Sequence, residues 1–406
     1  MATITIEHGA AVPKCPASLA LFSAGFRPFF LLAAIWSAVA LPVWLCVYAG
    51  EVVLPSALAP TLWHVHEMIF GFAFATIAGF LLTAIPNWTG RLPLRGAPLA
   101  MLAGLWLAGR FAVLFSGALG PLAAASVDLS FPAAFIAVIA RELIAGRNWR
   151  NLPMLAALGL LMSGSALVHL EAIGYAATAP LGNRLGVATV LMLIALVGGR
   201  IVPGFTRNWL AKARPGGALP AQAGRLDMAA LLVTLAGLGT WVAAPASAAA
   251  PWLELAAGFA VSVRLSRWCG LGTLREPLVF ILHLGYGWLG LGLLLLGANG
   301  LYPLLPSTAA LHALTAGAIG TMTLAVMTRA TLGHSGRPLV AGSGTRAIYL
   351  LVTLAAIVRL AAPLAGAQFL VLTWVAGAAW SGAFGLFALL YGRLLMGPRQ
   401  QTGPLM

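Results

Sequence analysis

The side chains best suited to chemistry in this sequence are histidines, because imidazole is a common ligand of metal ions and of haem iron. Apart from His8 near the N-terminus, they are His64, His66, His169, His283, His312 and His334. Most of them fall within, or at the ends of, long apolar segments. An ionisable group is costly inside such a segment if it crosses a membrane, and it usually marks a functional site.

The spacing of His64 and His66 limits how they can act. Residues two apart on a regular helix point about 200° away from each other, so both cannot bind one ion from the same helix. Either one histidine binds the ion and the other only helps to orient the ligands, or the two histidines bind at different sites on opposite sides of the helix. Two neighbouring metal centres that share one helix would explain the spacing.

Small residues accompany these histidines at helical spacing. They are Gly71, Ala75 and Gly79 for His64, Ser165 and Ala166 for His169, Gly287 and Gly290 for His283, and Ala316 and Gly320 for His312. Small neighbours could leave room for a planar macrocycle such as haem. The alternative is that they only allow helices to pack closely. Each histidine taken alone is better explained as a hydrogen-bonded core residue, whereas the set as a whole favours metal or haem.

Charged residues close to the histidines are candidates for supporting roles. Glu67 and Glu171 could accept hydrogen bonds from metal-binding imidazoles, form a proton path, or be helix-end charges that face water. Arg110 and Arg359 fall inside apolar segments. Each either extends towards the membrane surface or pairs with an anion, such as Asp128 or an acidic group of a cofactor.

Composition identifies the elements that must position these residues. Of 406 residues, 61% are hydrophobic and 8% are charged, whereas soluble domains carry about 25% charged residues. The net charge of +14 does not indicate nucleic-acid binding, since the basic residues are spread over short loops and are not gathered on one face. The three cysteines are isolated, which argues against a thiolate metal site.

Apolar runs long enough to cross a lipid bilayer predict an all-α membrane bundle of about twelve helices. The predicted spans are 28–49, 62–85, 97–117, 121–140, 152–173, 184–203, 226–245, 249–266, 277–297, 305–328, 346–363 and 367–391. They form one domain over residues 28–391, between a tail at 1–27 and a tail at 392–406.

The loops predict the orientation of these spans. The connections at 50–61, 117–121, 245–251, 298–304 and 364–366 contain no Lys or Arg, while the alternate connections are basic. The positive-inside rule then makes both termini cytoplasmic. This orientation gathers four histidines in the outer leaflet, namely His64, His66, His169 and His312. His283 lies nearer the inner face, and His334 lies in or beside a cytoplasmic loop.

Four ordered segments resemble the NnrS family. They are FRPFF at 26–30, WHVHEMIFGFAFATIAGFLLTAIPNWTG at 63–90, GGRIVPGFTRNWL at 198–210 and TMTLAVMTRATLGHSGRPL at 321–339. The resemblance implies a multi-pass protein of the bacterial inner membrane that contains haem, expected to be of the b type, and copper. It also implies a link to nitric oxide metabolism and to protection from nitrosative stress.

The same resemblance extends distantly to the twelve-helix catalytic subunit of haem-copper oxidases, in which a His-x-His helix lies between two haems. This chain lacks an adjacent His-His pair, so we do not expect a binuclear reducing centre. The cofactor ligands expected are His64, His66, His169, His283 and His312, with His64, His66, His312 and His334 as candidates for a metal ion.

A second hypothesis is a membrane transporter or carrier that binds a solute through buried His, Arg and Asp groups. Helices broken at paired Gly or Pro positions and an inverted repeat would favour it, and the sequence shows neither clearly. The partners expected are the lipid bilayer and nitric oxide or another small diatomic ligand. The sequence identifies neither an electron donor nor a catalytic residue, so it leaves open whether the protein is an enzyme.

Overall fold

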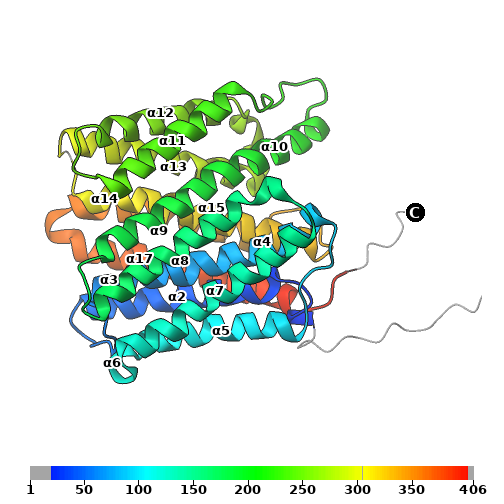
Figure 1. Ribbon diagram of the computed structural model, residues 1–406. Helices are drawn as coiled ribbons and strands as arrows, with labels where there is room; N and C mark the ends of the chain where they lie inside the picture. Colours follow the sequence, from blue (N-terminus) through cyan, green and yellow to red (C-terminus); the bar gives the residue numbers. More distant parts are fainter. Residues whose placement is uncertain (1–19, 304, 401–406) are drawn as a thin grey trace, which may run out of the picture.

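The computed structural model describes residues 20–303 and 305–400, a part of the chain that contains helices and no strand. The helices run side by side along one direction (Figure 1). The elements that cross the bundle are α2 (Phe26–Tyr48), α3 (Pro60–His66) continued by η1 (Glu67–Ala73) and α4 (Phe74–Thr89), α5 (Ala97–Leu114), α7 (Pro121–Ala145), α8 (Pro153–Ala172), α9 (Ala179–Leu193) continued by η3 (Ile194–Gly198) and α10 (Gly199–Ala213), α11 (Arg225–Ala243), α12 (Ala250–Ser266), α13 (Pro277–Leu301), α14 (Ser307–His312) continued by η5 (Ala313–Gly320) and α15 (Thr321–His334), α16 (Ser343–Ala361) and α17 (Phe369–Met396).

The expected polytopic helical bundle is confirmed. Within the described residues, eleven helices are long and apolar enough to cross a membrane, as judged by length and composition. The twelfth expected span corresponds to α12, which has 17 residues and includes Glu254 and Arg264. Arg27 Nη1 at the start of α2 donates a hydrogen bond of 2.8 Å to the carbonyl of Leu395 near the end of α17. The described chain therefore begins and ends at the same end of the bundle, as an even number of crossings requires.

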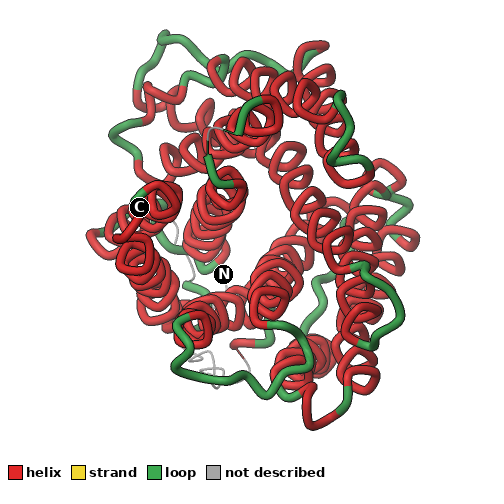
Figure 2. The backbone as a smooth tube through the Cα atoms, turned by 90° about the vertical axis from the view of Figure 1, so that its left-hand side faces the viewer, coloured by secondary structure: helices red, strands yellow, loops and turns green. Residues whose placement is uncertain are grey.

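Neighbouring helices in the sequence pack against each other, and α17 returns to pack along α2. Seen nearly end-on in Figure 2, the helices form one continuous assembly. The loops at one end, on the left in Figure 1, span residues 49–59, 115–120, 173–178, 244–249, 302–303 with 305–306, and 362–368, and contain no Lys or Arg. We call this the arginine-poor end.

Three of the crossing elements contain a π-helical segment, namely η1, η3 and η5. They occur in the second, sixth and tenth crossings, so three crossings lie between one and the next. A π-helical turn weakens the regular ladder of backbone bonds, and in an apolar surrounding the freed carbonyls need other donors. Trp106 Nε1 donates to the carbonyl of Gly71 at 3.1 Å, and Arg264 Nη1 donates to that of Ala195 at 2.7 Å.

Some boundaries differ from the predicted ones. The sixth crossing begins at Ala179 and continues as helix to Ala213, because its polar residues end the apolar run without ending the helix. Helix α17 extends to Met396, so the first residues of the expected C-terminal tail are helical. Most of the expected N-terminal tail, including His8, lies outside the described residues.

Candidate metal centre

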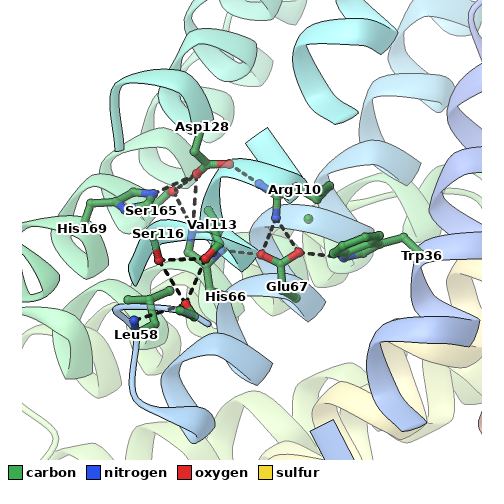
Figure 3. Close-up of polar contacts among 12 residues, drawn as sticks. Trp36, Leu58, His66, Glu67, Arg110, Val113, Ser116, Asp128, Ser165 and His169 are labelled. Carbon is green, nitrogen blue, oxygen red and sulfur yellow. Dashed lines mark hydrogen bonds and ion pairs between the residues drawn. The ribbon is translucent and has the colours of Figure 1, made fainter. Parts of the chain in front are cut away.

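A compact polar cluster lies inside the bundle towards the arginine-poor end (Figure 3). It contains His66 from the end of α3, Glu67 from the start of η1, Arg110 from α5, Asp128 from α7 and His169 from α8. All five side chains are buried, with at most 3% of any residue exposed. Five such groups in an apolar interior need one another as partners, because unpaired charges there are strongly unfavourable.

Two imidazoles and one carboxylate converge at the centre of this cluster. Asp128 Oδ2 lies 2.9 Å from His169 Nε2 and 3.3 Å from His66 Nε2. The two imidazole rings meet edge to face with their centroids 5.1 Å apart. One donor atom from each of the three residues lies within 4.8 Å of the others, which is a spacing that could hold a metal ion. Two imidazoles with one carboxylate are a donor set used by copper, zinc and non-haem iron.

Arg110 joins the two acidic residues of the cluster. Its Nη1 lies 2.8 Å from each carboxylate oxygen of Glu67, and its Nη2 donates to Asp128 Oδ1. Trp36 Nε1 on α2 donates a further hydrogen bond of 2.6 Å to Glu67 Oε2. Of the alternatives for Arg110, pairing with Asp128 is therefore the one that the structure shows. The planar guanidinium fixes both carboxylates relative to the histidines.

Two glycines allow the helices to approach closely enough for these contacts. A Cβ at Gly71 would lie 2.7 Å from Arg110 Nη1 and 3.0 Å from Glu67 Oε2. A Cβ at Gly109 would lie 2.8 Å from Asp128 Oδ1 and 3.2 Å from its Cα. Real Cβ contacts are not that short, so a side chain at either position would displace the charged groups. The glycines are thus part of how the cluster is built.

Hydrogen bonds connect His66 with the side chains around it. Ser165 Oγ donates to Asp128 Oδ2 at 3.2 Å, and it therefore accepts from His66 Nε2, which lies 3.2 Å away. His66 Nδ1 lies 3.1 Å from Glu67 Oε1, an oxygen that accepts from it. Both ring nitrogens of His66 thus lie beside oxygen atoms of neighbouring side chains. A metal ion would bind His66 through a ring nitrogen that carries no proton.

His64 lies on the other side of the same helix, as the two-residue spacing predicts. Its ring stacks on that of Trp44 from α2, with a centroid distance of 4.1 Å. His312 and Arg359 are close enough to act electrostatically on it. The four histidines expected to gather in the outer leaflet thus form two groups: His66 with His169, and His64 with His312.

The second group has nitrogen atoms that are free to bind a ligand. His312 Nδ1 lies 2.6 Å from the carbonyl of Thr308, so it carries the hydrogen and leaves the lone pair on Nε2. His64 Nδ1 is buried without a hydrogen-bond partner, and so is Arg359 Nη1. Imidazoles that bind metals commonly donate their second N–H to a backbone carbonyl, as His312 does.

The remaining expected residues lie elsewhere. His283 Nε2 is 2.8 Å from Thr206 Oγ1, on α10. The His334 ring, at the end of α15, packs on that of Phe26 with a centroid distance of 5.6 Å. Glu171 accepts a hydrogen bond of 2.8 Å from the backbone N–H of Ala179, at the first residue of α9. None of these contacts joins either histidine group.

Side chains fill much of the space beside the small residues that accompany the histidines. A Cβ at Gly79 would lie 2.7 Å from the Phe30 ring, and one at Gly320 would overlap the Trp380 ring. At these positions the glycines serve close packing of helices on aromatic rings. Gly79 and Gly320 therefore do not leave room for a macrocycle beside the histidines.

A second buried ion pair was not anticipated from the sequence. Arg264 Nε donates to Asp227 Oδ1 at 2.9 Å, and its Nη1 donates to the hydroxyl of Tyr286 at 2.9 Å and to the carbonyl of Ala195 in η3. Arg264 lies in the last turn of α12, next to a basic connection, and nothing in the sequence marks it as buried. An arginine 37 positions after an aspartate gives no periodic signal that links them.

The fold and the buried cluster define a polytopic helical membrane protein with an internal His–Asp–His group of metal-binding type. A family model described as NnrS protein matches residues 20–399, so the chain belongs to the NnrS family. The resemblance seen in four sequence segments is thereby confirmed over nearly the whole chain. The comparison with curated proteins gives no match.

Proposed function

We propose that this protein is a metal-binding membrane protein that acts in nitric oxide metabolism or protects cells from nitrosative stress. The observation that carries the proposal is the convergence of His66, Asp128 and His169 on one point inside an apolar bundle. Membership of the NnrS family supports the link to nitric oxide. The positive-inside rule supports the bacterial inner membrane as its location, with the arginine-poor end outside.

Copper is the metal that we propose for the His66 group. Imidazole nitrogen suits copper among several transition metals, and two nearby carboxylates would offset the charge of a divalent ion. Glu67 and Arg110 do not need to bind the metal themselves. Their role is to hold the orientation of His66 and Asp128, as outer partners do in most metal sites.

Haem is the cofactor that we propose for the His64 and His312 group. The donor atoms fit, since His312 presents the lone pair of Nε2 and His64 Nδ1 is buried without a partner. Arg359 provides a cation for an acidic group of the cofactor, the second alternative considered for it. A bound haem would supply an iron that binds nitric oxide. The residues of this chain hold the ring nitrogens in place and keep water away from them.

The experiment is metal analysis and visible spectroscopy of the protein purified in detergent. We expect copper in the wild type, and its loss in His169→Gln and Asp128→Asn. His283→Gln is the matched control, because that histidine contacts Thr206 outside both groups. A Soret band that shifts on addition of nitric oxide would support the haem. A wild-type protein that carries neither metal nor haem after growth with both would contradict the proposal and favour a transporter.

A further inference from the structure

An apolar cavity of about 90 Å³ lies between α4, α8, α9, η3 and α15. Its lining includes Ala73, Thr76, Leu158, Val197, Gly198 and Met322. We propose that this cavity binds a small apolar gas molecule, and that the gas is nitric oxide if the proposed function is correct.

Two π-helical segments, η1 and η3, contribute residues to this cavity, and the helix that continues the third, η5, contributes others. Ala73 is the last residue of η1, Val197 and Gly198 belong to η3, and Met322 follows the end of η5 by two residues. A π-helical turn changes the spacing of side chains, which interrupts the regular packing of ridges into grooves. Segments of this kind occur often at functional sites, and two of the three in the described chain border this cavity.

The chemistry of the lining excludes a polar ligand. Two hydroxyl groups lie among the lining residues, and both already donate to their own helix: Thr76 Oγ1 to the carbonyl of Phe72 at 3.2 Å, and Thr323 Oγ1 to that of Gly320 at 2.9 Å. The other lining side chains are apolar, so the cavity offers no charge and no imidazole. Water needs two or more polar partners in such a place, whereas an apolar molecule needs none.

The size of the cavity limits the occupant. An engineered apolar cavity of about 150 Å³ takes up benzene or xenon, and a single water needs roughly 10–15 Å³. A volume of about 90 Å³ lies between these values and suits a diatomic molecule or a xenon atom. Several lining side chains, including Ile77, Phe80 and Val326, are partly exposed, so the cavity opens towards the surface of the bundle and a gas molecule can enter it.

The position of the cavity connects it with the candidate metal centre. Ala73 lies seven residues beyond His66 along the same element, which corresponds to about 10 Å at 1.5 Å per residue. A gas molecule dissolved in the bilayer could bind in the cavity, close to the metal, before it reaches the metal itself. The cavity would then raise the local concentration of the ligand without forming a polar bond to it.

Xenon binding tests the cavity independently of any metal. Protein purified in detergent is titrated with dissolved xenon and followed by xenon NMR, for the wild type and for Val197→Phe and Val326→Phe, which fill the cavity from different helices. We expect the wild type to bind xenon and each variant to bind it at least tenfold more weakly. Val233→Phe on α11 is the matched control outside the cavity. If one variant fails to fold, the other carries the comparison.

Wild-type protein that takes up no xenon, or filled variants that bind it as the wild type does, would overturn the inference. So would native mass spectrometry that finds a lipid or quinone released by Val197→Phe. Metal analysis of the same samples separates the two proposals. If a protein that carries no metal still binds xenon, the gas-binding cavity is supported and the proposed function is contradicted. With metal present, stopped-flow mixing with nitric oxide should show association about tenfold slower in Val197→Phe.

Discussion

Arg110 and Glu67 face each other across the interface of α5 and η1, with one guanidinium nitrogen 2.8 Å from both carboxylate oxygens. Neither side chain reaches solvent, since Glu67 is fully buried and Arg110 is 2% exposed. Glu67 directly follows His66 in the chain, so this pair determines where the π-helical segment begins in space and where His66 points. A contact between charged groups thus sets the geometry of the candidate metal centre.

Replacing Arg110 by Met should destabilise the protein strongly. Two buried carboxylates would lose their common partner, and breaking a buried pair in this way costs about 3–5 kcal/mol. Unfolding of purified protein in detergent measures the loss. Arg91→Met is the control: Arg91 pairs with Glu142 at the surface with 44% of its side chain exposed, and such pairs contribute about 0–1 kcal/mol. Equal losses in the two variants would contradict the role given to Arg110.

Removal of the Ser165 hydroxyl should weaken metal binding without removing a ligand. Ser165 lies between His66 Nε2 and Asp128 Oδ2, so Ser165→Ala frees both groups to move. Loss of such an outer partner typically lowers metal affinity by about 10–100-fold. The measurement is copper affinity by competition with a chelator. Ser163→Ala is a suitable comparison, since Ser163 is exposed on the same helix and should leave the affinity unchanged.

Haem binding should depend on His312. In His312→Ala the haem should be lost, or its visible spectrum should shift, because the proposed haem would lose one of the residues that hold its iron. His66→Ala should also shift the spectrum, since His66 lies two residues from His64 on the same helix. His334→Ala should retain the haem, because His334 packs on Phe26 at the opposite end of the bundle. Unaltered spectra in both His312→Ala and His66→Ala would contradict haem binding in this region.

Adding one methyl group at Gly71 should disturb the metal centre. In Gly71→Ala the new Cβ would press on Arg110 Nη1, and overpacking of this kind costs about 1–3 kcal/mol. Copper content should fall along with stability. Gly104→Ala provides the opposite case: a Cβ there meets nothing within 4 Å, so the change should stabilise α5 by roughly 0.5–1 kcal/mol. Both values come from thermal unfolding in detergent.

The sequence predicted most of the fold because crossing a bilayer requires long apolar runs, which are visible without any tertiary information. Each predicted span coincides with a crossing element of the described chain. The errors lie at the ends, as at Ala213, where a helix continues beyond the apolar part. Helix ends of this kind depend on capping and on contacts outside the membrane.

The candidate site was predictable in part. The placement of His66 and His169 at the same depth followed from topology, and the divergence of His64 from His66 followed from helix geometry. Asp128 was recognised only as a partner for Arg110, although a lone acid in an apolar run was a signal for a ligand. The π-helical segments could not be predicted, because they depend on donors from other helices, such as Trp106 to Gly71.

These segments also change the rotational phase of the helices that contain them. In an α-helix each residue advances by about 100°, and a turn with hydrogen bonds to the fifth residue advances by less. Side chains beyond η1 therefore point in a direction that an uninterrupted helix would not give them. The continuous element α3–η1–α4 can therefore direct His66 towards α7 and α8 and, further along, direct Thr76 towards the apolar cavity. Deleting a single residue from η1 would restore ordinary phase and uncouple the two, even though every side chain that touches a ligand would still be present.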